Sequence, residues 1–214
     1  IRRLENVVMS GKARAHTNIA IIKYWGKADD TYIIPMNNSI SVALDRFYTE
    51  TEVSFDESYD KDTLVLNGEP VNEKELKKIS RFMDVVRDYS QQPLYAHIES
   101  ENFVPTAAGL ASSASAYAAL AAACNHALSL NLSDKDLSRL ARRGSGSASR
   151  SVFGGFVEWE KGHDDKTSFS HPIESDHWED ELSMIIVVIN DKAKSVSSRS
   201  GMALTRETSR FYQY

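Results

Sequence analysis

The segment with the clearest potential for chemistry is Pro105–Ser115, whose sequence is PTAAGLASSAS. Glycine and other small residues let a backbone approach a bulky anion closely. A helix that begins inside this segment would aim its free N–H groups and the positive end of its dipole at the loop, and its serines add hydroxyl donors. The segment is therefore a candidate phosphate cradle. The alternative is that its small residues only permit close helix packing.

Three other segments place cations beside hydroxyls or glycines. They are Gly144–Ser151 (GSGSASRS), Lys23–Lys27 (KYWGK) and Lys192–Met202, which contains Lys194, Ser197, Ser198 and Arg199. An arginine can hold a carboxylate or a diphosphate through two parallel hydrogen bonds. The alternatives are a solvated Gly/Ser linker and an exposed strand end. A cation 4 Å from a phosphate oxygen contributes roughly 4 kcal/mol at an effective dielectric near 20, so the hypothesis requires these segments to converge.

Composition and missing motifs exclude several other classes. The net charge of −5 and the pI of about 5.7 argue against a general nucleic-acid coat. The sequence has no Walker A loop, GxGxxG fingerprint or GxSxG elbow, and its six histidines show no metal-ligand spacing. Cys124 has no partner for an internal disulfide, which favours a cytoplasmic, reducing location. The alanine-rich run 107–124 is interrupted by serines, so it is not expected to span a membrane, and residues 1–12 lack a secretory signal pattern.

The elements that must position these segments form an α+β pattern. The length of 214 residues suits one large domain or a domain and a half. Strands are expected early, and helices do not alternate strictly with them, which favours a mixed sheet with helices on one face. The expected strands are Asn18–Trp25, Ile40–Leu44, Glu50–Phe55, Leu64–Leu66 before an Asn67-Gly68 turn, Tyr95–Ser100, Phe153–Trp159 and a central Leu182–Asn190. The expected helices are Glu73–Asp88 capped by Asn72, one from the 105–109 loop to about Leu130, and one capped by Ser133 and Asp136 that stops at Gly144.

The segments together resemble a known family. PTAAGLASSAS resembles the phosphate loop of the GHMP kinase superfamily, and AHTNIAIIKYWGK at 15–27 resembles the signature of the diphosphomevalonate decarboxylase family. PMNNSISVALD at 35–45, SGSASRS at 145–151 and SSRSGM at 197–202 fit the same family in the same order, in a form similar to Gram-positive bacterial members. The resemblance implies the GHMP N-terminal fold, which is similar to domain 2 of ribosomal protein S5.

The resemblance also implies a reaction. ATP and Mg²⁺ would serve the decarboxylation of (R)-5-diphosphomevalonate to isopentenyl diphosphate, CO₂, ADP and phosphate, through phosphorylation of the 3-hydroxyl group. The alternatives are another GHMP small-molecule kinase, acting on mevalonate or phosphomevalonate, and a nucleotide-binding module without catalysis. The implied partner is the small-molecule substrate, with a homodimer as a further option and with neither nucleic acid nor membrane. No metal ligand is assigned.

The same resemblance assigns site residues by motif. The catalytic group is Lys23, Arg150 and Ser198. The substrate-binding group is Ala20, Tyr24, Trp25, Gly26, Lys27, Ser145, Gly146, Ser147, Ala148, Ser149, Arg150, Arg199 and Met202. The ATP-binding group is Ser100, Ala108, Gly109, Leu110, Ala111, Ser112 and Ser113.

One departure concerns the end of the chain. Family members are longer, and their catalytic aspartate lies in the C-terminal portion, so this aspartate is expected beyond Tyr214. We therefore expect residues 1–10 to be a leader or the native N-terminus, 11–190 to form the ATP- and substrate-binding domain, and 191–214 to begin a C-terminal domain that is largely missing. A chain of this length is expected to be an incomplete enzyme.

Overall fold

The computed structural model describes residues 8–104, 112–176, 178–186 and 198–212. Its strands are β1 (Met9–Ile22), β2 (Lys27–Asp29), β3 (Ile34–Pro35), β4 (Ser39–Asp56), β5 (Thr63–Leu66), β6 (Glu69–Pro70), β7 (Tyr95–Phe103), β8 (Phe156–Trp159) and β9 (Ser170–Pro172). Its helices are α1 (Glu73–Ser90), α2 (Ser112–Ala127), α3 (Asp134–Gly144), the 3₁₀ helix η1 (Gly146–Val152), α4 (Trp178–Glu181) and α5 (Ser198–Thr208). This composition confirms the α+β class.

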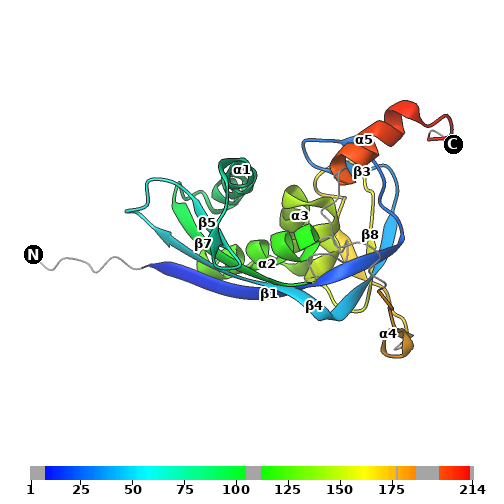
Figure 1. The fold of residues 1–214 in the computed structure, drawn as a ribbon, viewed down its shortest axis with the longest axis horizontal. Helices are drawn as coiled ribbons and strands as arrows, with labels where there is room; N and C mark the ends of the chain where they lie inside the picture. Colours follow the sequence, from blue (N-terminus) through cyan, green and yellow to red (C-terminus); the bar gives the residue numbers. More distant parts are fainter. Residues whose placement is uncertain (1–7, 105–111, 177, 187–197, 213–214) are drawn as a thin grey trace, which may run out of the picture.

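The long strand β4 organises the main sheet. It pairs with β1 along one edge and, along the other, with β7 near its C-terminal end and β8 near its N-terminal end. The β5–β7 pair is parallel, and all other described pairs are antiparallel. A separate two-stranded sheet, β2–β3, follows β1 and lies beside α5 (Figure 1).

Helices α1, α2 and α3 lie on the same side of the main sheet (Figure 1). Helix α2 packs on β1 and β4, and most of its described residues are buried there. A Cβ atom at Gly11 of β1 would overlap the α2 backbone at Ala123 and Ala127, so the helix lies almost directly on the strand. The alanine-rich sequence therefore has a packing role, because only small side chains allow this approach.

Several local predictions are confirmed. The Asn72 side chain caps α1 by accepting a hydrogen bond from the Glu75 N–H at 3.0 Å, and Ser133 caps α3 in the same way through Asp136 N–H. Asn67 and Gly68 have φ of 51° and 81° between β5 and β6, which is the left-handed backbone that a two-residue hairpin turn requires.

The early strands differ from the prediction. The two short strands expected at 40–44 and 50–55 are one strand, β4, because β1 pairs across both and the irregular stretch between them is bridged. There the His16 Nδ1 atom lies 2.8 Å from the Leu44 carbonyl oxygen. Strand β1 also begins at Met9 and ends at Ile22, so it starts earlier and stops before Trp25. Ile21 and Ile22, at the end of this apolar run, are about half exposed.

Of two later predictions, one is confirmed and one is wrong. Helix α3 ends at Gly144 as predicted, although this glycine is its last helical residue and does not adopt the left-handed backbone of a capping glycine. A glycine is needed at position 144 because a Cβ atom there would overlap the Tyr117 ring. Residues 182–186 are not a strand, and Leu182, Met184 and Ile185 are exposed. The rest of that prediction, 187–190, lies outside the described residues.

None of the described helices combines the length and the hydropathy needed to cross a bilayer.

Candidate anion-binding site

Arg150 of η1 is the most unusual charged group that the structure describes. Its side chain is only 2% exposed. Its Nε donates to Ser41 Oγ at 2.9 Å, Nη1 donates to Ser39 Oγ at 2.5 Å and Nη2 donates to Asn18 Oδ1 at 3.2 Å. Strands β1 and β4 thus hold the guanidinium in one orientation. Burial lowers the pKa of Arg150 to about 10, so the group remains positively charged at neutral pH.

All three of these hydrogen-bond partners are neutral. The nearest aromatic ring, that of Trp159, lies 5.8 Å from the guanidinium carbon, and within the described part of the chain no carboxylate pairs with Arg150. A buried charge without a counter-ion is costly. An anionic ligand would supply the missing charge, so this position has the character of an anion-binding site.

The 3₁₀ helix that carries Arg150 is fixed by a polar network. Asn18 Nδ2 donates to the Ser147 carbonyl at 3.0 Å and to Ser151 Oγ at 2.8 Å. Ser149 Oγ donates to the Gly146 carbonyl at 2.8 Å and accepts from Ser170 Oγ at 2.9 Å. The segment is therefore an ordered, mostly buried element and not the solvated linker that was its alternative interpretation.

The side chains of this element fall into two groups. Ala148 and Ser149 are completely buried, and the hydroxyl of Ser149 is used internally. Ser145 and Ser147 are partly exposed. Of the serines that the family motif assigns to substrate, these two are the ones whose side chains solvent reaches.

The KYWGK segment meets η1 through aromatic packing. The rings of Tyr24 and Trp159 pack edge to face with centroids 4.8 Å apart. A Cβ atom at Gly146 would lie 2.7 Å from Trp159 and 3.1 Å from Tyr24, so glycine is required there for packing. The KYWGK segment and η1 are more than 100 residues apart in the sequence, and they lie side by side at this point, as the hypothesis of convergence requires.

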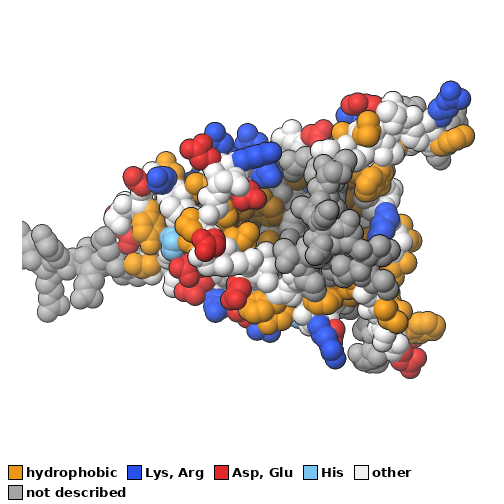
Figure 2. Space-filling view, in the orientation of Figure 1, with side chains coloured by type: hydrophobic (Ala, Val, Ile, Leu, Met, Phe, Trp, Pro, Cys, Tyr) orange, Lys and Arg blue, Asp and Glu red, His pale blue; other side chains and the backbone are white. Residues whose placement is uncertain are grey.

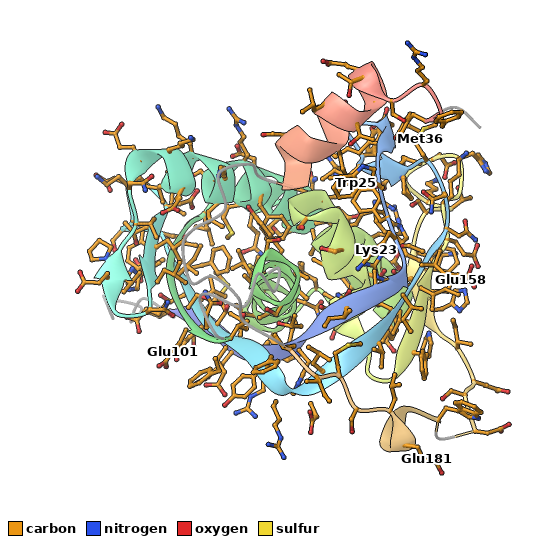
Figure 3. All side chains as sticks on the ribbon, turned by 45° about the vertical axis from the view of Figure 1, so that its right-hand side comes forward. Lys23, Trp25, Met36, Glu101, Glu158 and Glu181 are labelled. Carbon is orange, nitrogen blue, oxygen red and sulfur yellow. The ribbon has the colours of Figure 1, made fainter. Side chains whose placement is uncertain are left out.

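Helix α5 joins the same region from the other end of the chain. The Gly26 N–H donates to the Met202 sulfur at 3.3 Å, and the Tyr212 hydroxyl donates to the Trp25 carbonyl at 3.0 Å. In Figure 3, Trp25 and Met36 lie beside α5, and the Met36 N–H donates to the Gly26 carbonyl at 3.1 Å. Gly26 has φ of +115°, a backbone conformation that favours glycine.

A pocket opens between the KYWGK segment and α5. It is lined by Gly26, Lys27, Asp30, Met202, Ala203 and Arg206. Lys27 Nζ lies 3.1 Å from Asp30 Oδ1. The predicted substrate residues Gly26, Lys27 and Met202 therefore line one pocket.

The remaining predicted substrate-binding and catalytic residues lie on β1, in the loop after it and at the start of α5. Ala20 faces Ser41 across the β1–β4 ladder. Lys23 is exposed, and its carbonyl accepts a hydrogen bond from Asn37 Nδ2 at 3.0 Å. Ser198 and Arg199 begin α5, but their side chains lie outside the described parts, so their roles stay predictions.

The predicted ATP residues are only partly described. Ala108–Ala111 lie outside the described residues, as does the side chain of Ser112, the first residue of α2. Ser113 is exposed at the same helix end. Ser115 of the candidate cradle is buried, and its Oγ lies 2.8 Å from Thr49 Oγ1, which ties α2 to β4.

Ser100 lies in a second pocket, on the strands of the main sheet. Its Oγ lies 2.9 Å from Thr51 Oγ1. Four carboxylates also line this pocket: Glu50, Glu52, Glu99 and Glu101. The structure thus places Ser100 in an acidic setting, away from the pocket of Lys27, and its contact with the nucleotide stays a prediction.

Sequence reasoning missed the residues that hold Arg150. Asn18, Ser39 and Ser41 lie within motifs that carry the family resemblance, but no role was assigned to them. The sequence gives no sign that these three side chains bind an arginine, because Ser and Asn side chains commonly form hydrogen bonds with nearby backbone groups instead. Among the described residues, no group of three or more His, Cys, Asp or Glu side chains could hold a metal ion.

The surface charge agrees with a local site. Acidic and basic side chains are interspersed over the visible face, with basic groups over α1 and at the far end of α5 (Figure 2). The net charge of −5 therefore does not exclude a locally positive cavity.

A sheet covered by helices on one side, with a buried arginine and a serine-rich turn beside it, fits an N-terminal domain of the GHMP kinase superfamily, and the comparisons with known proteins support this class. The model of the diphosphomevalonate decarboxylase-like N-terminal domain matches residues 15–170. The chain belongs to the diphosphomevalonate decarboxylase family.

Individual relatives agree with this assignment. The diphosphomevalonate decarboxylase of Ganoderma lucidum is 42% identical over 97% of this chain, which spans 56% of that relative's length. The crystal structure of mevalonate diphosphate decarboxylase from Staphylococcus aureus is 68% identical, with a TM-score of 0.94 over 97% of this chain and 63% of that one. A structure described as MDDEF in complex with MVAPP, AMPPCP and magnesium is 62% identical, with a TM-score of 0.92 over 97% of this chain and 63% of that one.

Proposed function

We propose that this chain provides the substrate- and nucleotide-binding domain for ATP-dependent decarboxylation of 5-diphosphomevalonate to isopentenyl diphosphate, with release of CO₂, ADP and phosphate. The observation that carries the proposal is Arg150, a buried cation held by neutral partners only. The relative described in complex with MVAPP supports the choice of substrate. The chain spans little more than half the length of the curated relatives that it matches, so the activity is proposed for the protein that carries this domain.

The proposed chemistry has two stages. The γ-phosphoryl group of ATP moves to the 3-hydroxyl of the substrate through a charge-rich transition state. The C–C bond to the carboxylate then breaks as CO₂ forms, and its electron pair becomes the new double bond while the 3-phosphate leaves. Fixed cations and N–H groups that face the developing charge lower both barriers.

Each segment of the site has a proposed part in this chemistry. Arg150 binds an anionic group of the substrate from a fixed position, and Lys27 and Ser147 hold the diphosphate with Tyr24. Lys23 lowers the charge near the reacting hydroxyl, and Ser198 orders the complex. The segment 108–113 at the start of α2 cradles the ATP phosphates, which suits a helix N-terminus.

Mg²⁺ is the proposed companion of ATP. Magnesium sites in such enzymes are built largely from substrate phosphates, with only one or two protein carboxylates. The absence of a three-ligand cluster among the described residues is compatible with this arrangement. When bound, the ion would neutralise phosphate charge. We further propose a cytoplasmic location, and a homodimer as an assembly to be tested by light scattering.

Product analysis tests the proposed function. The protein that carries this domain is incubated with ATP, Mg²⁺ and diphosphomevalonate labelled at its carboxyl carbon, and CO₂ and isopentenyl diphosphate are measured against ADP. We expect the three products in equal amounts. A phosphorylated product without CO₂ would instead indicate a small-molecule kinase, and binding of both ligands without any turnover would indicate a binding module.

Replacement of Arg150 links the activity to the site. Arg150→Gln should lower kcat/KM by at least about 100-fold, because loss of a buried charge from an ion pair costs about 3 kcal/mol or more. Arg46→Gln, at an exposed position of β4, is the matched control and should keep the normal rate. Near-normal activity of the Arg150 variant would remove this residue from the site.

A further inference from the structure

The pocket between the KYWGK segment and α5 contains a cation that the family motifs do not account for. Arg206 lines this pocket together with Lys27 and Asp30. Arg206 is exposed and makes no ion pair with any residue of the described ranges. In contrast, Lys27 is mostly buried, with its side chain 13% exposed, and it is bonded to Asp30.

The geometry of α5 explains why Arg206 faces this pocket. Met202 is turned toward the KYWGK segment, since its sulfur accepts the Gly26 N–H. Residues 202 and 206 are four positions apart, so they follow one face of a helix. Arg206 thus lies one turn beyond Met202 on the face that is turned toward the KYWGK segment.

The charge of the pocket indicates what it would bind. Lys27 and Arg206 contribute two positive charges and Asp30 one negative charge, which leaves a surplus of one. Without Arg206, the Lys27–Asp30 pair would leave the pocket neutral. A phosphate group would gain charge-assisted hydrogen bonds from both cations, while Asp30, whose side chain is 75% exposed, can turn to solvent.

We propose that Arg206 is a further binding residue that, with Lys27, holds a phosphate of the substrate's diphosphate group, and that Asp30 competes with this phosphate for Lys27. This inference rests on the proposed function, because it takes diphosphomevalonate as the ligand. It adds a residue outside the segments that carry the family resemblance, and it assigns opposite effects to two neighbouring charges.

Calorimetric titration with diphosphomevalonate and, separately, with inorganic pyrophosphate tests the inference. Arg206→Gln should weaken the binding of both ligands about 10-fold, as expected for the loss of one charge-assisted hydrogen bond. Asp30→Asn should strengthen binding. Arg210→Gln is the matched control, because Arg210 is also exposed, four residues further on, but does not line the pocket. In turnover assays, Arg206→Gln should raise KM and leave kcat unchanged.

The outcomes separate the inference from the proposed function. If the wild-type protein binds diphosphomevalonate and the Arg206 and Arg210 variants bind it equally well, the inference is wrong and the proposed function stands. If the wild-type protein does not bind diphosphomevalonate, the proposed function is wrong, and pyrophosphate alone then decides the inference. Equal pyrophosphate affinities in the two variants would overturn it. Weaker ligand binding by the Asp30→Asn variant would also contradict the inference.

Discussion

Two buried arginines show how the surroundings of one residue type decide its role. Arg142 of α3 is completely buried, but it donates to the Asp165 carboxylate at 2.5 Å and to the Tyr32 carbonyl at 2.9 Å, as well as to the Ser168 carbonyl. Arg150 has only neutral partners. Burial lowers the pKa of both to about 10, but only Arg150 lacks a counter-ion. Arg142 therefore stabilises the fold, whereas Arg150 is the arginine that we propose for ligand binding.

Arg142→Gln should act on stability. Removal of one partner from a buried pair typically costs 3–5 kcal/mol, and Asp165 keeps Arg139 as a second partner at 2.6 Å. We therefore expect the free energy of unfolding to fall by about 3 kcal/mol in urea denaturation. A loss below about 1 kcal/mol would contradict the structural role of Arg142.

Gly146 offers a second test at the level of one atom. Gly146→Ala would push a methyl group toward Trp159 and Tyr24, so we expect a loss of about 1–3 kcal/mol from overpacking and weaker substrate binding through the displaced Tyr24. Gly154→Ala is the matched control, because no atom lies within 4 Å of the added methyl group. Equal stability of the two variants, measured by thermal unfolding, would show that the rings of Trp159 and Tyr24 do not pack closely against Gly146.

At the scale of elements, the capping of α3 makes the free energy of unfolding depend on pH. The Ser133 hydroxyl donates to the Asp136 carboxylate at 2.8 Å, and this bond, with a further contribution from Arg139, holds the pKa of Asp136 below its ordinary value of 3.8. The unfolded chain therefore binds this proton more readily than the folded chain. The stabilisation from Asp136 is fully present above pH 4 or so and is lost as the pH falls through the lower folded pKa.

Asp136→Asn tests this dependence. We expect the variant to be less stable than the wild-type protein at pH 6, and the difference in free energy of unfolding to shrink as the pH is lowered from about 4 to 2. Urea denaturation across this range measures the difference. A gap that stays constant with pH would mean that the carboxylate charge does not contribute to capping.

The local elements could be predicted well because their signals are local. Asn72, Ser133 and the Asn67-Gly68 pair each act on backbone within three residues, and all three predictions are confirmed. The continuity of β4 could not be predicted, because its middle is held by pairing with β1, more than 25 residues away in the sequence. The exposed ends of the apolar runs at 21–22 and 182–185 likewise depend on tertiary packing.

The candidate site shows the same division. Motifs named Arg150, Lys27 and Met202, and the structure places Lys27 and Met202 in one pocket. Motifs gave no role to Ser39 or Ser41, whose function depends on an arginine more than 100 residues further along the chain. They also could not separate Ser149, which is buried, from Ser147, which solvent reaches. Burial is decided by the whole sheet and not by the motif.

On the scale of the whole molecule, a net charge of −5 coexists with a pocket lined by two cations and one carboxylate. Surface charges farther apart than about 10 Å are screened at 0.1 M salt, so the distant carboxylates do not cancel Lys27 and Arg206 at the pocket. The local arrangement of charge, and not its sum, therefore governs attraction of a phosphorylated ligand.

Salt should weaken ligand binding for this reason. Between about 0.05 and 0.5 M KCl we expect the Kd for diphosphomevalonate to rise several-fold, because the exposed cation of the pocket is screened. In Arg206→Gln the rise should be smaller. Calorimetry at a series of salt concentrations measures the slope, and an affinity that does not change with salt would contradict an electrostatic contribution from the pocket rim.

The central claim is that segments 18–27, 145–151 and 198–206 form one site for a diphosphorylated acid. The most direct measurement is a calorimetric titration of the wild-type protein and of Arg150→Gln with diphosphomevalonate, which gives stoichiometry and affinity, with Gly154→Ala as the control. We predict one ligand per chain for the wild type and the control, and an affinity at least about 100-fold lower for the Arg150 variant. Equal affinities for all three proteins would contradict it.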